Sequence, residues 1–137
     1  MTAVDTRQPV GPHTADAAGW VPAPAGWVPV CRYEDLTPER GVCALVQGRQ
    51  VAVFRLAEGE LAAISNWDPF SRAGVLSRGI VGSRGSRPTV ATPLHKQTFD
   101  LRSGRCLDDP DVEIAVHAVR HEQGLVWLST ATPGRQA

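Results

Sequence analysis

The amino-acid sequence predicts an all-β fold, an antiparallel β-sandwich or partly open barrel with a small subdomain made of two loops. Short apolar runs alternate with turn residues about every 8 to 12 positions, a spacing typical of small sandwiches and barrels. The one helix candidate in the first half, residues 33–40, is limited to about one turn by Pro38. Residues 65–97 break the alternation, and an insert of this length in a compact domain usually carries function.

The first three strands follow from residues 42–65, with turns at residues 48–49 and 58–59. The middle strand places apolar side chains on both of its faces, so we expect a layer packed against each face. One face carries Val51 and Val53, and the other carries Ala52, Phe54 and Leu56.

Two further hairpins complete the domain. Residues 97–107 predict a hairpin that turns at residues 103–104. Its inward side chains are Phe99 and Leu101, and its outward side chains are Asp100 and Arg102. Residues 112–130 predict two longer strands around a turn at residues 122–124. His117 and His121 share one surface face there, about 13 Å apart by strand rise, which is too far to bind one metal ion together.

Composition divides the chain into three parts. Residues 1–26 are rich in Ala, Pro, Gly, Thr and Asp. Such a segment buries too little apolar surface to offset the entropy lost on ordering, so we expect a mobile N-terminal extension. Residues 27–130 form the β domain, and residues 131–137 are expected to be a frayed C-terminal tail.

Charge and cysteine content exclude several classes of function. The chain has 14 acidic and 14 basic residues, which gives no electrostatic reason to expect a nucleic acid or an anionic membrane as partner. No apolar run approaches the ~20 residues that span a bilayer. Cys31, Cys43 and Cys106 lie far apart, which argues against a disulfide framework or a zinc site and indicates buried thiols. Because no secretory leader precedes the domain, we expect a cytoplasmic protein.

The irregular segment carries two motifs, DPFSRAGVLSRG at residues 68–79 and TPLHKQTFDLRSG at residues 92–104. They resemble the loops of the Rieske domain, a β-sandwich that holds a [2Fe–2S] cluster. In that family the first loop reads C-x-H before a Leu-Ser-x-Gly-like phrase. The second reads C-P-x-H-G before a strand of the F-D-L-x-x-G type. The resemblance covers residues 27–130.

The resemblance also implies where cluster ligands would stand. Asp68 and Thr92 take the positions of the two cysteines and Phe70 that of one histidine, while His95 keeps its identity. A Rieske cluster needs two thiolates and two imidazoles, whereas a threonine hydroxyl stays protonated and a phenyl ring donates nothing. We therefore expect no metal and no cofactor in this chain.

A Rieske-like chain without these ligands is similar to the small-subunit family of cytoplasmic NAD(P)H-dependent nitrite reductases. That family shows an N-x-D-P-F first loop, a V-L-S-R-G phrase and an S/T-P-L-x-K-Q second loop, which stand here at residues 66–70, 75–79 and 92–97. The resemblance implies a large-subunit partner that carries FAD, siroheme and a [4Fe–4S] cluster and reduces nitrite to ammonium in nitrate assimilation. This chain would assist or modulate that subunit and catalyse no reaction alone.

The two loops are then expected to form a docking surface. No Ser-His-Asp or Cys-His arrangement has a recognisable context, so no residue is expected to be catalytic. Apolar side chains would make the contacts, and a basic rim would steer an acidic partner surface. The expected docking residues are Phe70, Arg72, Arg78, Leu94 and Lys96.

Two alternatives stay open. In the first, the chain is a Rieske-type ferredoxin that passes electrons and recruits unorthodox ligands such as Asp68 and His95. Bound iron and acid-labile sulfide would distinguish it. In the second, the chain is a free-standing Rieske-like interaction module unrelated to nitrite. A neighbouring gene for a siroheme reductase would argue against that.

Overall fold

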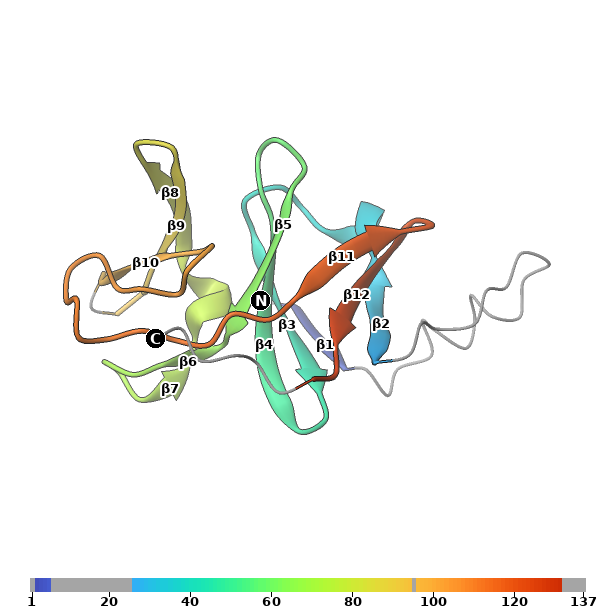
Figure 1. Cartoon of the computed structure of the whole chain (residues 1–137), viewed down its shortest axis with the longest axis horizontal. Coiled ribbons are helices and arrows are strands. Elements are labelled where there is room, and N and C mark those ends of the chain that lie inside the picture. Colours follow the sequence, from blue (N-terminus) through green and yellow to red (C-terminus); the bar gives the residue numbers. More distant parts are fainter. Residues whose placement is uncertain (1, 6–25, 95, 132–137) are drawn as a thin grey trace.

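The computed structural model describes residues 2–5, 26–94 and 96–131, and these residues form an all-β fold of four small sheets (Figure 1). The central sheet has the order β1 (Thr2–Asp5), β3 (Gly41–Val46), β4 (Arg49–Arg55), β5 (Leu61–Ser65). A second sheet has the order β11 (Val119–Glu122), β12 (Leu125–Ser129), β2 (Trp27–Arg32). A third has the order β10 (Thr98–Asp100), β9 (Arg87–Ala91), β8 (Ile80–Arg84), and the fourth pairs β6 (Trp67–Asp68) with β7 (Ala73–Gly74).

The central sheet is covered on both faces, as the sequence predicts. In Figure 1 it lies between the β2–β11–β12 sheet on one side and the β8–β9–β10 sheet on the other. Val51 and Val53 pack into one apolar core with Val126 and Leu128 of β12. The opposite face of β4 packs into a second core, to which the central sheet contributes Ala52, Phe54, Ala62 and Ile64, and to which Leu56, the residue after β4, also contributes. Each fully buried valine, leucine or phenylalanine contributes about 1.5–3 kcal/mol, so β4 stabilises both halves of the domain.

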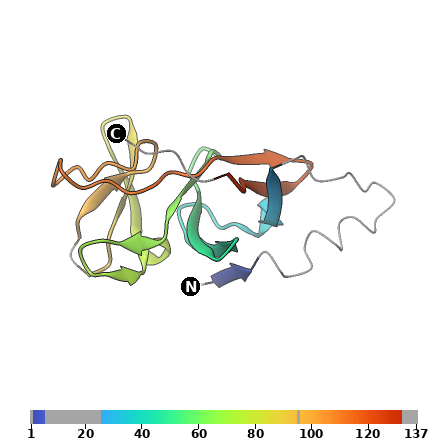
Figure 2. The same ribbon diagram turned by 60° about the horizontal axis from the view of Figure 1, so that its bottom comes forward.

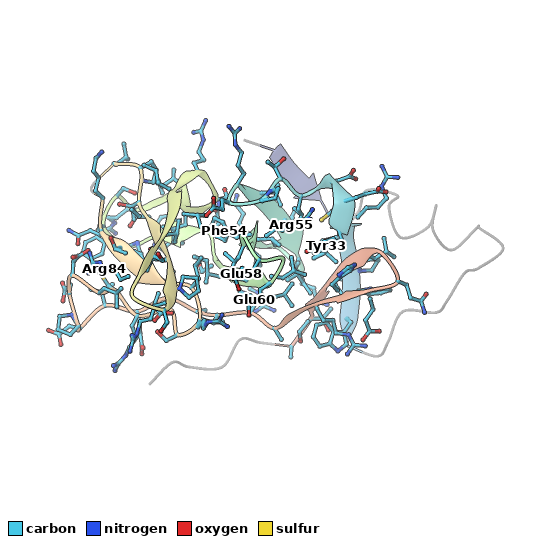
Figure 3. All side chains as sticks on the ribbon, turned by 90° about the horizontal axis from the view of Figure 1, so that it is seen from above. Tyr33, Phe54, Arg55, Glu58, Glu60 and Arg84 are labelled. Atoms are coloured by element: carbon cyan, nitrogen blue, oxygen red, sulfur yellow. The ribbon has the colours of Figure 1, made fainter. Side chains whose placement is uncertain are left out.

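A polar cluster at Tyr33 joins the first two sheets. The tyrosine belongs to the short 3₁₀ turn η1 (Tyr33–Asp35), which is the single helical turn expected near Pro38. Its hydroxyl donates to the Gly59 carbonyl at 2.6 Å, and its ring stacks on His121 with centroids 3.9 Å apart. The Arg55 guanidinium lies 4.3 Å from the ring centroid, and Figure 3 shows these two side chains together.

The strand β1 differs from expectation, because it lies within residues 1–26, where no strand was predicted. It pairs in parallel with β3, from Thr2 opposite Val42 to Asp5 opposite Leu45. Four residues are too few to show a strand by alternation alone, and the pairing depends on the edge that β3 offers. Residues 6–25 and 132–137 lie outside the described residues, so the mobile extension and the frayed tail stay predictions.

The expectation that residues 65–97 form an irregular insert is wrong. They contain β6, β7, the 3₁₀ turn η2 (Leu76–Arg78) and the β8–β9 hairpin. Alternation fails to reveal β8 because four of its five residues are exposed and two glycines, Gly82 and Gly85, lie in and beside it. A strand that is exposed along most of its length presents no alternating apolar face for a sequence pattern to detect.

The hairpin at residues 98–106 confirms one half of its prediction and contradicts the other. Phe99 and Leu101 are fully buried as predicted, and Arg102 is exposed. Asp100 does not point outward. Its carboxylate is buried, accepts the Arg102 and Ser103 main-chain N–H groups at 2.7 and 3.2 Å, and pairs with Arg87 at 3.1 Å. The aspartate faces inward because it satisfies the donors of the turn.

Candidate functional site

The two motif loops lie side by side at one end of the domain. In Figures 1 and 2 the β6–β7 loop lies next to the segment that leads from β9 to β10. The Phe70 ring of the first loop contacts the Phe99 ring of β10, with centroids 6.1 Å apart and planes inclined by 50°. Phe70 is half-buried and packs against the second apolar core. An apolar contact therefore links the first loop to the strand that follows the second.

Asp68 organises the first loop from within. Its side chain is fully buried. One carboxylate oxygen accepts the Phe70 main-chain N–H at 2.9 Å, and the other accepts the Ser71 hydroxyl at 2.7 Å. Its carbonyl oxygen accepts the Arg72 N–H at 2.7 Å. Both carboxylate oxygens are thus engaged by the loop itself.

Asn66 ties this loop to the central sheet, a role that the sequence motif did not reveal. The side chain is fully buried. Its Oδ1 accepts the Ser77 main-chain N–H at 2.7 Å, and its Nδ2 donates to Gln50 Oε1 at 3.0 Å. Its own main-chain N–H donates to the Gln50 carbonyl at 3.1 Å. The asparagine is the first residue of the N-x-D-P-F motif, and this motif position was the one sequence feature that pointed to a structural role for it.

Thr92 organises the second loop in a similar way. The residue is fully buried, and its Oγ1 accepts the Gln97 main-chain N–H at 3.1 Å. Its main-chain N–H donates to the Gln97 carbonyl at 2.8 Å, and its carbonyl accepts the Lys96 N–H at 3.1 Å. His95, the fourth ligand position, lies outside the described residues.

The described residues do not supply the donor set of a [2Fe–2S] cluster. The oxygens of Asp68 and Thr92 are hydrogen-bonded inside their loops, and Phe70 has no donor atom. The three cysteines are buried, as predicted. Burial and the negative charge of Asp35 raise the pKa of Cys31 to about 12, and burial also raises the pKa of Cys43, so these two stay thiols. Within residues 2–5, 26–94 and 96–131, no three His, Cys, Asp or Glu side chains are grouped to hold a metal ion.

The expected docking residues fall into two places. Arg72, Leu94 and Lys96 are exposed on the two loops, and Leu94 is 65% exposed. Arg72 and Lys96 both adopt a left-handed backbone, with φ of 57° and 58°. Arg78 lies in η2 and lines a groove of about 520 Å³ together with Arg40.

Two residues beside the first loop line a pocket that the sequence did not predict. Trp67 in β6 is 51% exposed. His117 was expected at the surface, but its side chain is buried, because its main-chain N–H bonds to the Ala63 carbonyl at 2.9 Å and holds the segment against β5. Burial and the positive charge of Arg49 lower the pKa of His117. Both residues line one pocket, with Arg49.

No helix among the described residues is long and apolar enough to cross a membrane.

Comparison with known proteins gives consistent matches. Residues 26–129 match the family model of the Rieske-like [2Fe-2S] domain. The nitrite reductase (NADH) small subunit of Escherichia coli K12 is 41% identical over 103 residues, which are 74% of this chain and 95% of that protein. A crystal structure described as an NADH-dependent nitrite reductase small subunit from Mycobacterium tuberculosis superimposes with a TM-score of 0.75 at 46% identity, covering 77% of this chain and 96% of the other. The nitrite reductase [NAD(P)H] large subunit of Klebsiella oxytoca is 36% identical over 102 residues, which are 74% of this chain and 11% of that protein.

Proposed function

The chain belongs to the Rieske-like [2Fe-2S] domain family, within the group of nitrite reductase small subunits, and from this we propose that it is the small subunit of an NAD(P)H-dependent nitrite reductase. The similarity extends over 95% of the E. coli small subunit, so the proposal concerns the whole domain. The chain is then part of an oxidoreductase.

We propose further that this subunit works without a cluster. The observation that carries this proposal is the use of both cysteine-equivalent side chains, Asp68 and Thr92, as hydrogen-bond acceptors within their own loops. A cluster cross-links two loops through metal–ligand bonds, whereas here the loops are organised by hydrogen bonds and by the contact of Phe70 with Phe99. The same donor argument speaks against a Rieske-type ferredoxin that would recruit Asp68.

The proposed partner is a large subunit that carries FAD, siroheme and a [4Fe–4S] cluster and reduces nitrite to ammonium with electrons from NAD(P)H. The presence of a similar region inside the K. oxytoca large subunit supports a domain that acts next to such a protein. The chain would assist or modulate this partner in the cytoplasm and would contribute no catalytic residue.

The proposed docking surface comprises the two loops and the neighbouring η2 turn. Exposed basic side chains at the loop tips would raise the rate at which an acidic surface associates, and Leu94 would supply an apolar contact. The residues of this surface are Phe70, Arg72, Arg78, Leu94 and Lys96.

Co-expression with the large subunit encoded in the same genome tests the function. We expect the two chains to purify together and nitrite-dependent oxidation of NAD(P)H to be higher, or longer-lived, in the complex than in the large subunit alone. Separate elution of the two chains together with unchanged activity of the large subunit would contradict the proposal.

A further inference from the structure

A pocket of about 360 Å³ opens on the side of the first loop. It lies where the start of β4, the β6–β7 hairpin and the segment before β11 meet, and Trp67 and Gly74 are paired across that hairpin. The lining residues are Arg49, Gln50, Ser65, Trp67, Gly74 and His117, with Ala115.

Arg49 brings an uncompensated positive charge to this pocket. Among the described residues, no carboxylate lines the pocket. Elsewhere Arg84, Arg87 and Arg102 pair with acidic side chains at 2.9–3.2 Å, whereas within the described part of the chain Arg49 forms no ion pair or hydrogen bond through its side chain. Its positive charge acts on the imidazole of His117, whose pKa is lowered by burial and by this charge. A guanidinium in this position is available to an incoming acid.

His117 is the second polar group of the pocket. The residue is only 7% exposed, and neither ring nitrogen forms a hydrogen bond to any residue of the described ranges. The ring nitrogens are nevertheless not among the buried unpartnered side-chain atoms of those residues, so they are open to the pocket. An imidazole that lines a pocket without an intramolecular hydrogen bond is available to a group that enters the pocket. A neutral imidazole carries one N–H donor for such a group.

Trp67 forms an aromatic wall beside these two groups. Its side chain is 51% exposed, although most large apolar side chains of the domain are buried. Its backbone is held by the pairing with Gly74 in β7 and by its main-chain N–H, which donates to Ser65 Oγ at 3.2 Å. Tryptophan and arginine are the residues most enriched among side chains that dominate binding energy at protein interfaces.

We infer that this pocket binds the carboxylate of an acidic side chain of the large subunit, an inference that rests on the proposed function. One guanidinium balances the single negative charge of a carboxylate, and the His117 N–H satisfies a further carboxylate lone pair. A phosphate group with nearly two negative charges would call for a second cation, and the part of the chain that the structure describes places no lysine or second arginine in the lining. The open side of the pocket and its place beside the first loop favour a side chain delivered by the docked partner.

The test measures the affinity of the full chain for the purified large subunit by isothermal titration calorimetry. Arg49→Gln and Trp67→Ala are compared with the matched control Arg32→Gln. The control removes an exposed arginine at the end of β2, in the β11–β12–β2 sheet. We expect both pocket variants to bind about tenfold more weakly or worse, and the control to bind within about twofold of the wild type. Thermal unfolding verifies that all variants are folded.

The possible outcomes distinguish a failure of the pocket inference from a failure of the proposed function. If the wild type does not bind the large subunit at all, the proposed function fails. If the wild type binds and Arg49→Gln binds as tightly as Arg32→Gln, the function stands and the pocket inference is overturned. Free acetate serves as a second probe, followed by the NMR signals of the His117 ring. Saturable acetate binding without any effect of Arg49→Gln on association would assign the pocket to a small molecule, which also overturns the inference.

Discussion

Asp68 and Thr92 make corresponding hydrogen bonds in the two loops. Each accepts a main-chain N–H on a side-chain oxygen, from Phe70 at 2.9 Å and from Gln97 at 3.1 Å. Each also accepts, on its carbonyl oxygen, the N–H of the residue four positions later. Those two later residues, Arg72 and Lys96, have the left-handed backbone that closes each loop.

This correspondence explains how the two loops keep the arrangement of a Rieske cluster-binding site without the thiolate ligands. In each loop the side chain at the cysteine-equivalent position is short, buried and a hydrogen-bond acceptor. It therefore satisfies a loop N–H that would otherwise be buried without a partner. The loop conformation is therefore stabilised by hydrogen bonds within the chain and does not depend on bonds to a metal cluster.

The first prediction concerns Asp68→Asn. An amide has one acceptor oxygen in place of two and cannot accept both the Phe70 N–H and the Ser71 hydroxyl in the present geometry. We expect the free energy of unfolding in urea to fall by about 1–3 kcal/mol. Asp111→Asn, at an exposed turn, is the matched control and should change it by less than about 0.5 kcal/mol. Equal effects of the two substitutions would show that the buried carboxylate does not organise the loop.

The second prediction concerns Thr92. Thr92→Val keeps the shape but removes the acceptor for the Gln97 N–H, whereas Thr92→Ser keeps the acceptor. We expect faster hydrogen exchange of the Gln97 amide in the valine variant alone, with a loss of stability of about 1–3 kcal/mol. Unchanged exchange in Thr92→Val would mean that this hydrogen bond does not hold the loop.

The third prediction concerns the docking surface. Replacing Arg72, Arg78 and Lys96 together by glutamate should weaken association with the large subunit at least about tenfold, mainly by slowing association at low salt. All three side chains are exposed, so the unfolding temperature should stay within a few degrees of that of the wild type. A pull-down and association kinetics that match those of the wild type would remove these residues from the interface.

The fourth prediction concerns pH. Burial and Arg49 lower the pKa of His117 in the folded protein below its value in the unfolded chain. Protons therefore bind the unfolded state more readily, so the stability that depends on neutral His117 is present above pH ~6.5 and is lost as pH falls through the lowered folded pKa.

Urea unfolding of the wild type and His117→Gln at pH ~7.5 and ~5 measures this effect. The wild type should lose more stability between the two pH values than the variant, because the other histidines titrate in both proteins. An equal loss in the two proteins would show that His117 does not contribute to the pH dependence.

The sequence predicted the parts of the fold in which packing decides the pattern. The alternation in β4 identified both of its faces correctly, because each face packs into an apolar core. The β8–β9 hairpin escaped detection because β8 is mostly exposed and β9 buries only Thr89 and Val90, so burial imposes no alternation long enough to recognise. Asp100 was placed on the wrong face because alternation says nothing of the turn donors that the carboxylate satisfies.

In the candidate site too, the sequence predicted some features and could not predict others. The motifs located the two loops, and the structure brings them side by side (Figure 2). Motifs do not reveal the partners of a side chain across the fold, so neither the brace from Asn66 to Gln50 nor the pocket of Arg49 and His117 was expected. Those groups come from segments distant in sequence, and tertiary packing alone joins them.

The most direct test of a cluster-free subunit is the iron and acid-labile sulfide content of the full chain purified without oxygen, with its visible absorption spectrum. The account predicts a colourless protein without stoichiometric iron or sulfide that is folded and binds the large subunit. Two irons and two sulfides per chain with visible absorption would contradict it. The chain would then be an electron carrier, and His95 would be the first residue to replace.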